Sequence, residues 1–168
     1  MASVTLWDLA EAARAKAHEW AAANRPPGVV QELMLCLGEC PDGPTKNMDE
    51  VTEWKIVFND FPAPTDDLEE AELWSYEVDG RTDTGQLGDV DVHDEEFLGN
   101  SAIHGTITMT PPEAYKILCE YRQEEEAFQW VSLRLPPSSG HVGYNFLYDP
   151  LGHHGWAVNV DNRKVVKW

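Results

Sequence analysis

Carboxylates gathered in two clusters are the side chains of this sequence whose types and spacing point most directly to chemistry. The first cluster comprises Asp66, Asp67, Glu69, Glu70 and Glu72, and the second comprises Asp89, Asp91, Asp94, Glu95 and Glu96. Between residues 49 and 96 there are 17 acidic residues against Lys55 and Arg81, and 2 − 17 gives a local charge of −15. Such a segment favours the binding of a basic partner. It would either steer that partner by long-range attraction or mimic the phosphate groups that the partner binds. It also suits a solvated connection that keeps the protein in solution.

The second cluster was considered as a metal site. Asp89, Asp91 and His93 alternate, so in a strand they would share one face and could ligate a hard cation. The spacing is not that of a calcium-binding EF-hand loop, because Asp94 stands where that loop needs Gly and Asn100 where it needs a bidentate Glu. We therefore predict no metal and no cofactor.

Catalytic motifs are missing from the sequence. It has no glycine-rich phosphate-binding loop, no paired Cys-x-x-Cys motifs and no Gly-x-Ser-x-Gly elbow. His104 and His141 are the candidate catalytic residues, since either could act as an acid or base beside a carboxylate. The sequence thus favours a binding protein over an enzyme.

Overall charge and composition exclude several functions. The chain has 168 residues with 12 Lys and Arg against 30 Asp and Glu, a net charge of −18, which excludes nucleic acid and anionic membranes as main partners. A hydrophobic fraction of 42% with seven Trp is enough for a real core. Three cysteines make no disulfide framework and favour the cytoplasm, unless a secretion signal has been removed.

Periodicity predicts the elements that must position these residues. Leu6, Leu9, Ala13 and Trp20 recur at helical spacing and predict a helix over residues 6–23. Alternating apolar residues predict strands over 29–37, 51–58 and 73–78, the last reaching a turn at 79–80. The same order then recurs, as a helix near 112–125 and strands over 131–135, 144–148 and 156–160.

This repeated order predicts an α+β fold of two helix-plus-three-strand repeats, each helix packed on an antiparallel sheet. The first repeat would span residues 1–88 with an acidic insertion, residues 89–109 would be an acidic connection with room for an extra strand, and the second repeat would span 110–168. The predicted core contains Trp54, Ile56, Phe58, Trp74, Tyr144, Phe146 and Trp156.

A strand that runs into a polar turn carries a family resemblance. Residues 76–86 read Tyr-Glu-Val-Asp-Gly-Arg-Thr-Asp-Thr-Gly-Gln, and this strand ending in Asp before a Thr-Gly turn resembles the PepSY domain. The counterpart at 157–165 keeps Asp161 and a following strand but has no Thr-Gly. The resemblance implies a binding or peptidase-inhibiting module. The same small α+β shape is also similar to immunity proteins, which neutralise bacterial toxins inside the cell that makes them.

From these observations we expect a soluble cytoplasmic inhibitor or immunity protein. Its two acidic clusters would bind a basic protein, such as a toxin, a nuclease or a peptidase. The alternative is a small biosynthetic or hydrolytic enzyme with a pocket between the repeats. A pocket lined by convergent polar groups would favour the enzyme, and an acidic face without such a pocket would favour the inhibitor.

Overall fold

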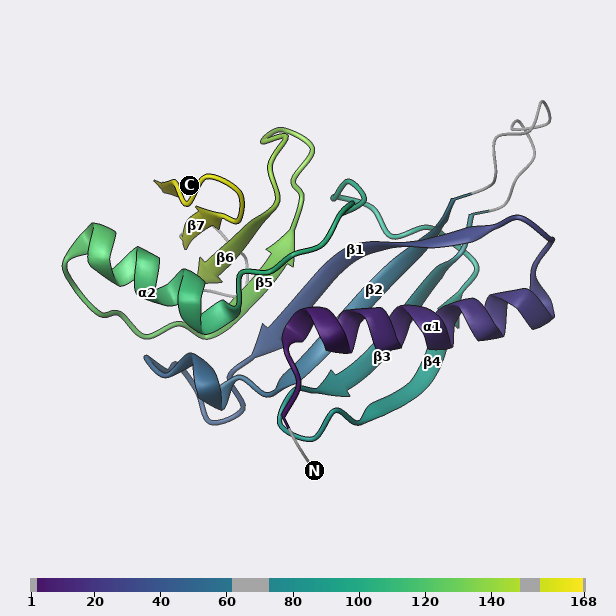
Figure 1. Ribbon diagram of the computed structural model, residues 1–168, viewed down its shortest axis with the longest axis horizontal. Coiled ribbons are helices and arrows are strands. Elements are labelled where there is room, and N and C mark those ends of the chain that lie inside the picture. Colours follow the sequence, from purple (N-terminus) through teal and green to yellow (C-terminus); the bar gives the residue numbers. More distant parts are fainter. Residues whose placement is uncertain (1–2, 62–72, 149–154, 168) are drawn as a thin grey trace.

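Eight antiparallel strands in a single sheet, with two helices, make up the computed structural model, which describes residues 3–61, 73–148 and 155–167 (Figure 1). The helices are α1 (Leu6–Asn24) and α2 (Pro111–Arg122), with one short 3₁₀ helix, η1 (Met48–Glu50). The strands are β1 (Val30–Glu39), β2 (Glu53–Phe61), β3 (Ser75–Arg81), β4 (Leu87–His93), β5 (Trp130–Arg134), β6 (Gly143–Leu147), β7 (Gly155–Asn159) and β8 (Val165–Lys167). Their order across the sheet is β4-β3-β2-β1-β5-β6-β7-β8. The protein is therefore α+β.

Both helices lie against the same face of the sheet, α1 over β1–β4 and α2 over β6–β8 (Figure 1). Thr5 caps α1 by accepting a hydrogen bond from the Asp8 N–H at 3.1 Å, and Thr110 caps α2 through the Glu113 N–H at 3.4 Å. Gln123, in the left-handed conformation, ends α2. Within the described residues, neither helix is long and apolar enough to cross a membrane.

The core is a layer between the helices and this face of the sheet. Strand register aligns one apolar position from every strand into a single row, namely Val90, Val78, Ile56, Cys36, Leu133, Tyr144, Val158 and Val165. The six central members of this row, from Val78 to Val158, are at most 1% exposed. Small residues of α1, including Ala13 and Ala17 at 0% exposure, let the helix lie close to the sheet.

Strands β1 and β5 join the two halves of the sheet. They pair antiparallel from Leu35 opposite Arg134 to Glu39 opposite Trp130. Beyond this pairing, residues 97–103 close the seam, because Ser101 bridges to Leu135 and Ile103 bridges to Leu33. One continuous core results.

Each half is a helix followed by four strands, so the expectation of three strands per repeat was wrong. The additional strands are β4, which spans the boundary expected at residue 88, and the short β8. The expected turn at Asp79-Gly80 was also wrong, because both residues lie inside β3 and the turn follows at 82–85. Packing favours Gly80, since a Cβ there would lie 2.8 Å from Leu87 Cδ2 and 3.0 Å from Leu9 Cδ2, so that these side chains would have to shift.

Two of the predicted core tryptophans are only half-buried. Trp74 lies under the guanidinium of Arg25, 4.3 Å from the ring centroid, and Arg25 forms an ion pair with buried Asp60 at 3.2 Å. Trp156 lies in the same way under Arg122, at 4.6 Å. A cation over an indole ring anchors the C-terminal end of each helix, which explains why these rings reach the surface. The other five predicted core residues are buried, at 3% exposure or less.

A shared core predicts that the two halves unfold together. Phe58→Ala in the first half and Phe146→Ala in the second, both at 0% exposure, should each lower the free energy of unfolding by about 3–5 kcal/mol. Each should shift one and the same denaturation transition, measured by far-UV circular dichroism and tryptophan fluorescence. Leu98→Ala, at a residue that is 74% exposed, is the control without effect. Two separate transitions, each moved by only one of the substitutions, would contradict a single core.

Candidate functional site: the helix-free face of the sheet

The sheet face opposite the helices carries apolar residues that do not belong to the core. Leu35, Leu37, Val57 and Trp130 all lie outside the continuous core cluster, and we call them the apolar strip. Strand alternation places them here, because their neighbours Cys36, Ile56 and Val131 point to the helices. Val57 is 3% exposed and the other three are half-buried. The half-buried members of the strip, Leu35, Leu37 and Trp130, are apolar surface on a face without helices, and such surface is suited to contact with another molecule.

Charged side chains border the apolar strip on β2 and β3 and on the edge strand β4. The Lys55 ammonium lies 3.0 Å from Glu77 Oε1, and His93 Nε2 lies 3.0 Å from Glu77 Oε2. The hydrogen bond to Glu77, with the charges of Glu77, Asp79 and Asp91, holds the pKa of Lys55 above its usual range. The Asp91 side chain is 75% exposed, and Asp79 is also exposed. This border is therefore acidic, with one lysine among three carboxylates.

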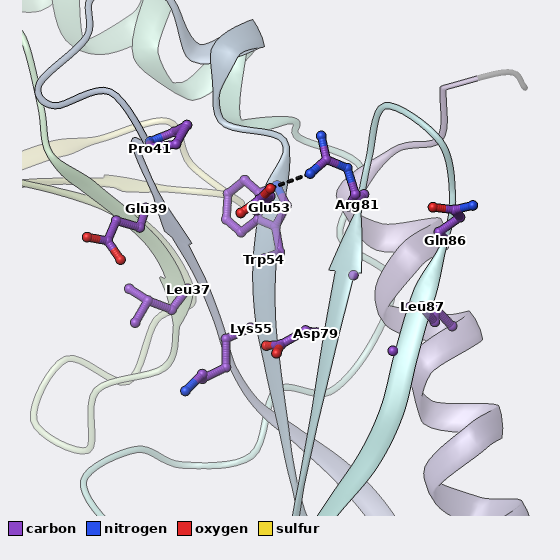
Figure 2. Close-up of a pocket in the computed structure, with 12 residues that line it drawn as sticks. Leu37, Glu39, Pro41, Glu53, Trp54, Lys55, Asp79, Arg81, Gln86 and Leu87 are labelled. Carbon is purple, nitrogen blue, oxygen red and sulfur yellow. Dashed lines mark hydrogen bonds and ion pairs between the residues drawn. The ribbon is translucent and has the colours of Figure 1, made fainter.

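A hollow of about 600 Å³ lies at one end of this face (Figure 2). Leu37 and Glu39 of β1 line it together with Lys55 of β2 and Asp79 of β3, and Gly88 of β4 lies at its far side. Figure 2 shows Leu37, Lys55 and Asp79 as neighbours across the three strands. Arg81 is held by Glu53, drawn as the dashed line, and by Asp83 at 2.9 Å. The hollow is open, and both apolar and charged groups line it.

The opposite end of the face is occupied by the chain itself. The Asn59 side chain donates to the Phe97 carbonyl at 2.9 Å and accepts from the Phe97 N–H at 2.8 Å. Asn59 is 2% exposed as a result. The accessible part of the face is thus the end that contains the hollow.

The predicted acidic clusters are placed in part. Asp66, Asp67, Glu69, Glu70 and Glu72 lie outside the described residues. Asp89 and Asp91 are exposed on β4, and Asp94, Glu95 and Glu96 are exposed in the loop that follows. Of these five, Asp91 approaches the charged group around Glu77, where it lies 3.6 Å from His93 Nε2.

The two candidate catalytic histidines occupy different surroundings. His104 is exposed and forms an ion pair with Glu32 of β1 at 3.0 Å. His141 is exposed in the loop before β6 and lines a second hollow of about 480 Å³ with Asn145, Asn159 and Lys164. Among the residues that the structure describes, no group of three or more His, Cys, Asp or Glu could hold a metal.

Sequence reasoning missed the residues at the centre of this face. Glu53, Lys55 and Glu77 are isolated charges in strands that are recognised by their apolar positions, and Asp79 was expected only as the end of a strand before a turn. The available signal was the alternation itself, since charges between core residues must lie on the opposite face. Only the register, which sets Lys55 opposite both Leu37 and Asp79, brings charge next to the apolar strip.

Comparisons with known proteins show the fold. No family model matches the chain, and no curated protein matches it significantly by sequence. A crystal structure from Clostridium difficile 630, described as that of a "putative lipoprotein", aligns with a TM-score of 0.53 and 11% identity. The alignment covers 100% of this chain and 95% of that one. At this identity the likeness establishes a shared fold over the whole chain and nothing about activity.

The exposed carboxylates of the face should contribute little to folding. Asp79→Asn with Asp91→Asn is expected to change the free energy of unfolding by less than about 1 kcal/mol, because exposed charges are well solvated. Val57→Asp should cost more than about 2 kcal/mol, since it places an unpaired charge at a buried position. Urea denaturation measures both. A large loss from the Asn pair would mean that these carboxylates are structural rather than free for a partner.

Proposed function

We propose that this chain is a protein-binding inhibitor or immunity module that uses the helix-free face of its sheet against a basic partner. The observation that carries the proposal is the asymmetry of the sheet. Both helices pack on one face, while the other keeps an apolar strip beside an acidic border at its accessible end. An apolar centre with a charged rim is the usual anatomy of a protein interface.

Electrostatics supports a basic protein as the partner, which could be a toxin, a nuclease or a peptidase. A net charge of −18 repels nucleic acid and anionic lipid and attracts cationic surfaces over long distances. The resemblance to PepSY domains and to immunity proteins agrees with this proposal. A cytoplasmic location is part of the same proposal, and it suits the free thiols of Cys36, Cys40 and Cys119.

Internal duplication is a second component of the proposal. Both halves run from a helix into four antiparallel strands, and their strand orders mirror each other about the pairing of β1 with β5. An arginine stacked on a tryptophan recurs at the end of each helix, as Arg25 on Trp74 and Arg122 on Trp156. We infer that a duplicated unit diverged so that the first half became acidic and the second did not.

Steering by the acidic border gives a direct test. With the partner captured from its native host, Asp79→Asn, Asp89→Asn and Asp91→Asn together should slow association about tenfold at about 0.1 M salt and have little effect at about 1 M. The dissociation rate should change less, because these charges lie at the rim. Association and dissociation rates are measured by surface plasmon resonance.

A matched control separates this face from overall charge. Glu19→Gln, Glu120→Gln and Glu125→Gln remove the same number of charges from exposed positions on or after the helices. If these substitutions slow association as much as the β3–β4 set, net charge alone attracts the partner. The expected partner-binding clusters at 66–72 and 94–96 are neutralised in further variants, which show whether they extend the docking surface.

A further inference from the structure

Strand register shows where the charged side chains of the helix-free face lie. Two rows of directly paired positions cross it from β3 or β4 to β6, the first comprising Asp79, Lys55, Leu37, Ser132 and Asn145, and the second comprising Asp91, Glu77, Val57, Leu35, Arg134 and Gly143. Every carboxylate in these rows lies on β3 or β4. The apolar residues lie on β1 and β2, and the positions on β5 and β6 carry no acid. Two exposed carboxylates outside these rows, Glu53 on β2 and Glu39 on β1, also line the hollow, and Glu39 is paired with Trp130. On the other side, Ser132 and Asn145 are buried, at 3% exposure or less. A partner at the accessible end of this face thus meets Leu37 and Trp130 with carboxylates from β1 to β4 around them.

The single lysine on the acidic side is an internal counter-ion. Lys55 stands opposite Asp79 in the register, contacts Glu77 at 3.0 Å and is also influenced by the charge of Asp91. Three carboxylates and one ammonium leave a net charge of −2 before His93 is counted. The ammonium lies next to Leu37. A cation from a partner would be attracted most strongly by the same carboxylates at this position.

The neighbouring cation cannot balance this charge. Arg81 is already engaged by Glu53 and Asp83, so its guanidinium is committed at the edge of the hollow. Asp79 and Asp91 are the two most exposed carboxylates of the group. As seen from the apolar strip, Asp79 lies beyond Lys55 and Asp91 lies beyond Glu77. Both carboxylates therefore remain available to a lysine or arginine of a partner that carries an apolar side chain next to it.

We propose that the occupant of this face is an exposed segment of a partner protein in which an apolar side chain lies next to a lysine or arginine. This inference rests on the proposed protein-binding function. The apolar side chain contacts the half-buried Leu37 and Trp130, while the basic group approaches Asp79 and Asp91. Lys55 opposes the basic group and therefore limits the affinity of the complex.

We expect that removing the Lys55 ammonium strengthens the binding of a basic segment. Lys55→Met keeps the aliphatic stem that borders Leu37 and removes the ammonium. A basic segment should then bind about two- to fivefold more tightly, which is the scale of one exposed charge pair. Asp79→Asn with Asp91→Asn should weaken binding about tenfold. Each effect should shrink as salt rises.

A random library of displayed cyclic peptides, selected on the full chain, provides the probe. Selected sequences should be enriched in an aliphatic or aromatic residue next to Lys or Arg. A synthetic peptide of the selected consensus is then titrated by calorimetry into the parent protein and into the Lys55→Met, Asp79→Asn/Asp91→Asn and Leu37→Ser variants. Trp130→Ala is a second variant of the apolar strip should Leu37→Ser unfold, and Glu19→Gln/Glu120→Gln is the control expected to bind like the parent.

The outcomes separate this inference from the function beneath it. Two outcomes would overturn the inference and leave protein binding at this face intact. In the first, the selected peptides lose affinity for Leu37→Ser but are not enriched in Lys or Arg. In the second, the peptides bind Lys55→Met more weakly than the parent protein. Peptides indifferent to every substitution on the face would instead overturn the face as the docking surface. Binding of spermine with the affinity of the peptide would show that charge alone is recognised, and that too would overturn the inference.

Discussion

The antiparallel pairing of β1 with β5 is the interaction on which the rest of this structure depends. Half of this chain, at about 80 residues, would bury a smaller fraction of its surface than the whole chain does and would be marginally stable alone. By pairing Cys36 with Leu133, the seam lets one apolar row run through all eight strands. Burial at this seam raises the pKa of the Cys36 thiol to about 12, so the thiol stays protonated within the core.

One consequence of the joined sheet is that its two faces differ completely. Both helices pack on the same side, so they bury the row that contains Ile56 and leave Lys55 and Val57 on the other side. Strand geometry requires this, because consecutive side chains must point in opposite directions. The residues that build the core therefore determine which residues a partner can meet.

Local periodicity predicted much of the fold. The rest depends on long-range strand register, which the sequence alone does not reveal. Leu6, Leu9 and Ala13 revealed α1, and alternation revealed six of the eight strands. β4 was expected only as room for an extra strand within residues 89–109, because Asp89 and Asp91 hide the alternation of Val90 with Val92. β8 was expected only as a strand following Asp161, because its three residues give no pattern of their own. Gly80 suggested a turn, although its role is to admit Leu9 of α1, a contact far away in the sequence.

The candidate site was less predictable than the fold for the same reason. Counting charges along the chain identified dense runs such as 94–96, whereas the charged group beside the apolar strip draws Lys55, Glu77 and Asp91 from three different strands. The sequence pointed to Asp91 as a member of an acidic cluster, but neither Lys55 nor Glu77 stands out by itself. The burial of the tryptophans was difficult to predict for a similar reason. In the sequence, Trp74 and Trp156 resemble core residues, and only the structure shows that arginines cover them at the surface.

Hydrogen–deuterium exchange of the complex with its partner tests the central claim most directly, because it locates the docking surface without altering the protein. The account predicts added protection in β1–β3 and in the edge strand β4 around Asp91, with exchange in α1 and α2 unchanged. Buried strands exchange slowly in the free protein as well, so exchange is measured in both the free and the bound forms. Only the difference between the two forms is interpreted. Added protection confined to the outer surfaces of the helices would contradict the assignment of the helix-free face.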